Sequence, residues 1–171
     1  LLTMDYKFNG AATVGDKVVF APFHANVVGV FDVATNTFST PATTGSLTMI
    51  NKYAGAAAVG TNVVFAPYVA DVVGVFDVAT NTFSTPATTG SLTMDNKFAG
   101  AAAVGTKVVF APLHADVVGV FDVATSTFST PATTGPLTMS DKFYGAAVVG
   151  TKVVFAPRDA DAVGVFGTPC T

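Results

Sequence analysis

Two histidines and a recurring acidic column are the side chains in this sequence that could hold a metal. His24 and His114 stand 90 residues apart. The acidic column recurs every 45 residues and comprises Asn26, Asp71, Asp116 and Asp161. Carboxylates gathered around an axis could bind a hard cation such as Ca²⁺. The same groups could instead cap their own loops, or pair with a parallel lysine column, which comprises Lys7, Lys52, Lys97 and Lys142.

No catalytic constellation accompanies these residues. Two histidines alone make a poor zinc site, because structural zinc takes four ligands. The segment 100–107, GAAAVGTK, has Thr before Lys and is followed by strand-like VVFAP, which is the wrong order for a phosphate-binding loop. A third column, Asp32, Asp77 and Asp122, precedes Ala-Thr in each copy, which is ordinary turn chemistry. We therefore expect neither an enzyme nor a cofactor.

Composition narrows the classes of partner. Half of the 171 residues are hydrophobic, only 11% are charged, and the net charge is -3. This balance gives no electrostatic basis for binding nucleic acid, and Pro, Gly and Asn interrupt every apolar run before it could span a bilayer. The single cysteine, Cys170, excludes a disulfide within the chain but not one between chains. Low charge and abundant Thr favour an extracellular setting.

Internal repetition is the dominant feature of the sequence. The stretch VVGVFDVATNTFSTPATTG runs from Val27 to Gly45 and returns unchanged from Val72 to Gly90. We expect one repeat domain over residues 1–171, with repeats at 2–46, 47–91, 92–136 and a truncated 137–171. A period of this length is typical of propellers, solenoids and arrays, whose units bury their apolar faces against one another.

Four strand-like runs fill each copy, and in the second copy they are AGAAAV, NVVFAPY, VVGVFDV and TFST. β-branched and aromatic residues dominate, and Gly60 and Pro67 disfavour helices. Four strands in about 45 residues predict an all-β propeller with four blades of four antiparallel strands, the last incomplete. Small residues would line the axis, and the Phe65 and Phe76 columns would fill the gaps between blades. A β-solenoid is the alternative.

The segment Asn62–Thr85 resembles repeats of the kelch and YVTN propeller types. Both share an aliphatic-aromatic strand, a short loop, and a strand ending in Asp before a Thr-Asn-Thr hairpin. The likeness rests on Val63–Phe65, on Asp77 and on residues 80–83. The sequence departs at Ala66-Pro67, where kelch repeats carry a Gly pair, and at Phe83, where they carry Trp. The resemblance implies a blade and no particular function.

The loop between the second and third runs carries most of the variation between copies. The candidate binding residues at its variable positions are Phe23, His24, Tyr68, Leu113, His114, Arg158 and Asp159. A binding surface on a rigid frame would show this contrast, and so would unconstrained loop tips. This loop and the long link between copies, STPATTGSLTMDNK, should lie on one face of the propeller.

The fourth copy stops after AVGVF and lacks its outermost strand. The ring could close with one three-stranded blade, two chains could combine, or copies could join end to end. We expect a non-catalytic scaffold that forms a homo-oligomer or polymer, with a protein partner. The alternative is a propeller that binds a glycan or small molecule through aromatic loop residues such as Phe23 and Tyr68. Neither nucleic acid nor membrane insertion is expected.

Overall fold

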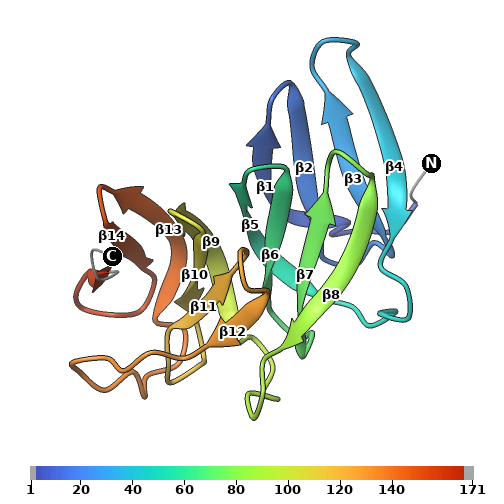
Figure 1. Ribbon diagram of the computed structural model, residues 1–171. Helices are drawn as coiled ribbons and strands as arrows, with labels where there is room; N and C mark the ends of the chain where they lie inside the picture. Colours follow the sequence, from blue (N-terminus) through green and yellow to red (C-terminus); the bar gives the residue numbers. More distant parts are fainter. Residues whose placement is uncertain (1–2, 168–171) are drawn as a thin grey trace.

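The computed structural model describes residues 3–167 and shows four antiparallel sheets that follow one another along the chain (Figure 1). We call them blades 1 to 4. Blade 1 contains β1 (Phe8–Val14), β2 (Lys17–Pro22), β3 (Val27–Asp32) and β4 (Thr37–Thr43). Blade 2 contains β5 (Tyr53–Val59), β6 (Asn62–Pro67), β7 (Val72–Asp77) and β8 (Thr82–Thr88). Blade 3 contains β9 (Phe98–Val104), β10 (Lys107–Pro112), β11 (Gly119–Asp122) and β12 (Thr127–Ser129). Blade 4 contains β13 (Phe143–Val149), β14 (Lys152–Pro157) and β15 (Gly164–Gly167).

Each blade is a simple meander, in which every strand pairs with the next one along the chain. The tight links have the expected turn chemistry: Gly60 has φ +60° between β5 and β6, and Asn81 has φ +56° between β7 and β8. Within the described residues there is no helix, so the predicted all-β class and the four-run blade are confirmed. The outer strand β8 is longer than the predicted TFST. Cys170 lies outside the described residues.

Small residues bring the innermost strands together. A Cβ atom built on Gly55 would lie 2.6 Å from the Cα of Gly100, and one on Gly10 would lie 2.5 Å from the Cα of Gly55. Real Cβ atoms do not approach a backbone so closely. Each of these glycines also has a positive φ, which L side chains rarely adopt. The expectation of small residues near the axis is therefore met by the glycine column.

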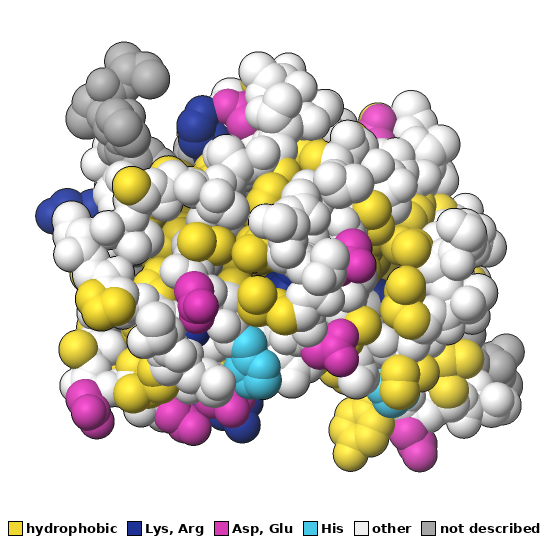
Figure 2. Space-filling view, turned by 90° about the horizontal axis from the view of Figure 1, so that it is seen from below, with side chains coloured by type: hydrophobic (Ala, Val, Ile, Leu, Met, Phe, Trp, Pro, Cys, Tyr) yellow, Lys and Arg dark blue, Asp and Glu magenta, His cyan; other side chains and the backbone are white. Residues whose placement is uncertain are grey.

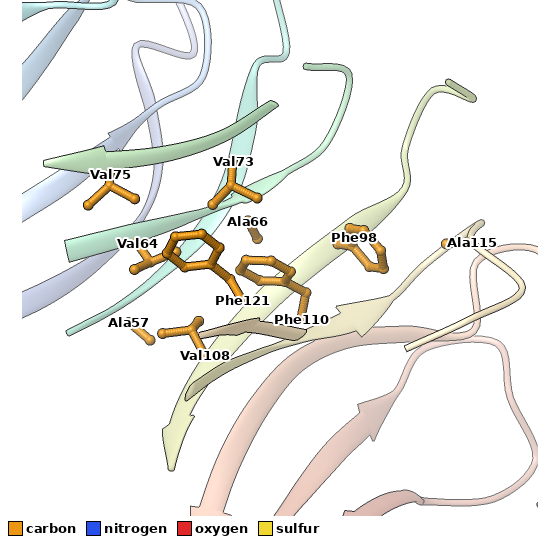
Figure 3. Close-up of a cluster of buried hydrophobic side chains, with 10 residues drawn as sticks. All are labelled: Ala57, Val64, Ala66, Val73, Val75, Phe98, Val108, Phe110, Ala115 and Phe121. Carbon is orange, nitrogen blue, oxygen red and sulfur yellow. The ribbon is translucent and has the colours of Figure 1, made fainter. Parts of the chain in front are cut away.

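Most of the hydrophobic core lies between successive blades rather than within one. Each blade has a front face, turned toward the next blade, and a back face, turned toward the preceding one. At the junction of blades 2 and 3, the small front-face side chains Val64, Ala66 and Val73 meet the rings of Phe98, Phe110 and Phe121 and the side chain of Val108 (Figure 3). The predicted role of the Phe65 and Phe76 columns is confirmed, because both rings are fully buried between blades 1 and 2.

The loops between the second and third strands of each blade lie on the same end of the molecule as the links between blades (Figure 1). Figure 2 shows this end: hydrophobic side chains reach the surface between the loops, and charged groups are scattered among them. Backbone hydrogen bonds tie the loops of blades 1 to 3 to the following blade, for example from the amide of Lys97 to the carbonyl of Tyr68, 3.0 Å. The loops are thus fixed to the frame.

Candidate interaction site

The front face of blade 4 exposes residues that are buried in every other blade. Val163 is 57% exposed, whereas the residues at the same position in blades 1 to 3 are 0%, 0% and 3% exposed; they are Val28, Val73 and Val118. Val165 is 60% exposed, and its equivalents in blades 1 to 3 are buried; Val149 is 72% exposed, and its equivalents are half-buried. The residue type in this column is unchanged, so the exposure arises because no blade within residues 3–167 covers this face.

The back face of blade 1 is the matching open surface. Phe8 and Phe20 are half-buried here, whereas Tyr53 and Phe65, at the same positions of blade 2, are fully buried. On the outer strand, Phe38 is 51% exposed. This face consists of large rings, and the front face of blade 4 consists of valines and alanines. The two open faces are therefore the two halves of one ordinary blade junction.

The glycine column shows the same opening. A Cβ atom on Gly100 would lie 2.6 Å from the Cα of Gly145, but one on Gly145 would meet nothing closer than the Cβ of Ala156, at 3.8 Å. No strands of blades 1 and 4 pack closely against each other within residues 3–167. One hydrogen bond joins them, from Nδ2 of Asn9 to the Tyr144 hydroxyl, 3.0 Å. The four blades thus form an arc whose ends approach without packing.

Buried lysines join blades 2 and 3 to the blades before them. Lys97 is fully buried, and its Nζ donates to Oδ1 of Asp71 at 3.0 Å and to the carbonyls of Val69 and Met94. Three oxygen acceptors satisfy the ammonium group, and the carboxylate balances its charge. The lysine–acid pairing weighed at the sequence level therefore exists at this junction.

The preceding junction uses a neutral partner. Nζ of Lys52 donates to Oδ1 of Asn26 at 3.1 Å and to the carbonyls of His24 and Met49. Burial lowers the pKa of Lys52 to about 8, because desolvation disfavours the charged form. Burial also lowers the pKa of Lys142, against the raising influence of Asp116 and Asp141.

At the open junction the corresponding pair is Lys7 of blade 1 and Asp161 of blade 4. Neither forms an ion pair with any other part of the chain that the structure describes. The back face of blade 1 thus carries one cation, and the front face of blade 4 carries one carboxylate. Their positions repeat those of Lys97 and Asp71.

Three of the predicted loop residues converge at one end of the axis. The rings of Phe23 and Tyr68 meet edge to face with centroids 5.6 Å apart, and both pack against a small cluster that contains Leu113, which is fully buried. Burial is the main cause that raises the pKa of Tyr68, with Tyr144 and Asp141 adding to it and Arg158 opposing it. These side chains fill the end of the axis.

The two loop histidines contact the next blade. His24 stacks on Phe23 and lies 2.8 Å from Oδ1 of Asn51. His114 Nε2 lies 3.5 Å from a carboxylate oxygen of Asp141.

The charged pair of the fourth blade lies at the same end. Arg158 Nη1 binds Asp141 at 3.0 Å, its guanidinium lies 5.9 Å from the centre of the Tyr144 ring, and its Nε is 3.9 Å from Asp159. The variable positions are therefore placed around one end of the axis, where the histidines contact the next blade and Arg158 contacts residues of its own blade.

Within the described residues, carboxylates of the acidic columns bond to groups of the blades themselves. Asp71 is held by Lys97, and no group of three or more His, Cys, Asp and Glu side chains is placed to hold a metal within residues 3–167. Oδ1 of Asp77 accepts the amide of Ala79, and the same hairpin bond forms at Asp122. A hydrogen bond from Lys17 is the largest cause that lowers the pKa of Asp32. The carboxylates thus act in three structural contacts: Asp71 between blades, Asp77 in a hairpin turn, and Asp32 in a cross-strand pair.

Comparison with known proteins supports this architecture. The sequence matches no protein-family model and no curated protein. In structure it is similar to the WD40 repeats of RRP9, with a TM-score of 0.67 and 14% identity over 92% of this chain and 45% of that one. The fold is that of a β-propeller. The predicted propeller resemblance is confirmed at the level of the fold, because WD40 repeats are propeller blades.

Two further structures extend the likeness. The computationally designed Ika4 protein has a TM-score of 0.66 and 13% identity over 99% of this chain and 96% of that one. The hydrazine synthase of Kuenenia stuttgartiensis has a TM-score of 0.69 and 13% identity over 97% of this chain and 47% of that one. The propeller described here thus spans nearly all of Ika4 and less than half of the other two chains. No helix in its described residues is long and apolar enough to cross a membrane.

The sequence did not reveal the open faces. All four copies carry a valine at the position of Val163, and the first three carry a ring at the position of Phe38, so these residue types do not differ between open and covered faces. The one available signal was the order of the copies: a linear chain of blades has a first back face and a last front face. Whether those faces meet depends on the angle between blades, which the sequence pattern does not give.

Proposed function

We propose that this propeller is a non-catalytic scaffold that works through protein–protein contacts, and that it self-associates head to tail. In this arrangement the front face of blade 4 in one copy receives the back face of blade 1 in a second copy. The observation that supports this proposal most strongly is the exposure of Val163 and Val165, because their equivalents are buried at three junctions of the same chain. The back face of a blade fits this surface, because back faces cover the equivalent valines at the three junctions within the chain.

Apolar burial supplies the driving force for this contact. Covering one exposed valine or phenylalanine side chain contributes roughly 1.5–3 kcal/mol before the entropic cost of association. Lys7 and Asp161 would meet across the new junction as Lys97 and Asp71 do within the chain. The interface is heterologous, so repeated addition closes into a ring or continues as a filament.

The likeness to the RRP9 WD40 repeats is consistent with this proposal, since the four blades match 45% of that chain. In the proposed assembly, the blades of a second copy extend the arc. We propose that each copy behaves as one unit with repeats at 2–46, 47–91, 92–136 and 137–171, and we retain the extracellular setting as part of the proposal.

The alternative of a glycan- or small-molecule-binding propeller would use the loop end of the axis. Phe23 and Tyr68 contact each other there, and Leu113 is buried beneath them. These rings already pack on protein, so self-association uses the more exposed apolar surface.

Aspartate substitutions test the proposal. Val163→Asp places a charge on the open face of blade 4 and should abolish association measured by light scattering on a sizing column. Ile50→Asp is the matched control, because Ile50 is 62% exposed and blades 1 and 3 carry Asp5 and Asp95 at that position. The control should associate as the parent does. Equal association of both variants would overturn the head-to-tail contact.

A further inference from the structure

The outer strands of blades 1 and 2 carry a segment rich in threonine. The segment STPATT runs from Ser39 to Thr44 and returns from Ser84 to Thr89. It lies in β4 and β8, the outermost strands of their blades, and within residues 3–167 each of these strands pairs on one side only (Figure 1). Serine, threonine and proline together are the composition typical of O-glycosylated segments.

The last threonine of each segment has a structural role. Thr44 is buried, and its hydroxyl donates to the carbonyl of Leu47 at 2.8 Å. Thr89 is also buried, and its hydroxyl donates to the carbonyl of Leu92 at 2.7 Å. These hydroxyls hold the start of the link to the next blade, and their burial keeps an enzyme from reaching them.

The first threonine of each segment has the opposite environment. Thr40 and Thr85 are exposed, and their hydroxyls form no hydrogen bond with the part of the chain that the structure describes. Thr130 holds the same position in blade 3 and is exposed as well. One exposed hydroxyl therefore stands at the same place on the outside of three successive blades.

A β-bulge interrupts the strand pairing at these threonines. In blade 1 the register of β3 and β4 shifts, so that Thr40 and Pro41 together stand opposite Gly29. The same shift between β7 and β8 places Thr85 and Pro86 opposite a single glycine in blade 2. A bulge leaves its extra residue without a ladder partner, and proline has no N–H to donate. Each threonine thus lies at a break in the ladder, where its backbone and side chain are accessible together.

We propose that Thr40, Thr85 and Thr130 are acceptor sites for O-linked N-acetylhexosamine. The threonine oxygen bonds to the anomeric carbon of a nucleotide-activated sugar, the bond from that carbon to the diphosphate breaks, and the nucleoside diphosphate leaves. The hydroxyl proton passes to a base of the transferase. A sugar at the bulge covers the edge of the outer strand and blocks its pairing with another sheet. The inference does not depend on the head-to-tail contact.

Enzymatic transfer to the folded chain tests the proposal. In one arm the whole chain is incubated with UDP-N-acetylgalactosamine and a polypeptide N-acetylgalactosaminyltransferase. In the other arm it is incubated with UDP-N-acetylglucosamine and a protein O-N-acetylglucosaminyltransferase, so the two arms distinguish the sugar source. We expect addition in at least one arm, and fragmentation in the mass spectrometer should place the sugar on Thr40 and Thr85. No addition in either arm, or addition to Thr44 and Thr89 instead, would overturn the proposal.

Two valine variants locate the acceptors, because valine keeps the β-branched shape and replaces the hydroxyl by a methyl group. The first variant removes the three proposed acceptors through Thr40→Val, Thr85→Val and Thr130→Val. It should lose the transfer. The matched control removes exposed threonines three residues further along, through Thr43→Val, Thr88→Val and Thr133→Val. It should be glycosylated as the parent is. Transfer that persists in the first variant would refute the assigned sites. If that variant proves unfolded, the positions of the sugar on the unaltered chain still decide.

Discussion

The ammonium group of Lys97 lies 3.0 Å from the carboxylate of Asp71, across the boundary between two blades. The lysine is fully buried and the aspartate is 56% exposed. One blade back, Lys52 is equally buried but faces the amide of Asn26. The same contact between blades thus occurs once with a carboxylate and once with a neutral amide. The contribution of the carboxylate to stability can therefore be measured.

Asn26→Asp should stabilise the protein. A carboxylate facing the buried ammonium of Lys52 raises the pKa of that lysine and strengthens the hydrogen bond, so we expect the free energy of unfolding to rise by about 1 kcal/mol at neutral pH. Urea titration measures it. In a Lys52→Met background the same change should give no gain, and a gain of equal size there would show that the pair is not responsible.

Stability should depend on alkaline pH through Lys52. Its pKa falls from 10.5 in the unfolded chain to about 8 in the fold, so the unfolded state binds more protons between these values and stability increases with pH across that window. Since one pKa unit corresponds to about 1.4 kcal/mol, a rise of about 1–3 kcal/mol is expected.

The rise should end near pH 10. Burial raises the pKa of the Tyr53 phenol, so the unfolded chain loses this proton first and stability falls at higher pH. Unfolding titrations from pH 7 to 10 measure the slope, and Lys52→Met should reduce it. An unchanged slope in that variant would assign the effect to other groups.

Glycine substitutions separate backbone strain from close packing. Gly55→Ala and Gly145→Ala impose nearly the same strain, with φ of +106° and +111°. A Cβ on Gly55 meets the backbone of Gly100 at 2.6 Å, whereas one on Gly145 has 3.8 Å of room. We expect Gly55→Ala to cost roughly 2 kcal/mol more in thermal unfolding at low protein concentration. Equal costs would mean that the glycine contact does not constrain the blades.

The same substitution in two blades measures the difference between a covered and an open face. Val73→Asp buries an unpaired carboxylate and should cost about 3 kcal/mol or more. Val163→Asp, at a 57% exposed position, should change the stability of the single chain by less than about 1 kcal/mol. Circular dichroism melts compare them. Similar losses in both variants would show that blade 4 is covered in solution by its own chain.

Much of the fold could be predicted from the repeat. Period, β-branched runs and turn residues specify each blade, because contacts within a blade are local in the chain. The buried positions of Phe65 and Phe76 followed from the same pattern. Closure of the ring was not predictable, since it depends on small angles between blades that add up over the chain.

The candidate site was only partly predictable. The variable loop positions do cluster around one end of the axis, but Leu113 is buried there and Arg158 pairs with Asp141. Variation between copies therefore reports both exposure and junction-specific packing.

The mass of the native particle, measured by light scattering over a range of concentrations, tests the head-to-tail account most directly. Because the open faces of blades 1 and 4 complement each other, the account predicts a particle that is a multiple of the 17.3 kDa chain. It also predicts that Val163→Asp returns the particle to a single chain. A mass of 17.3 kDa at every concentration would contradict the account.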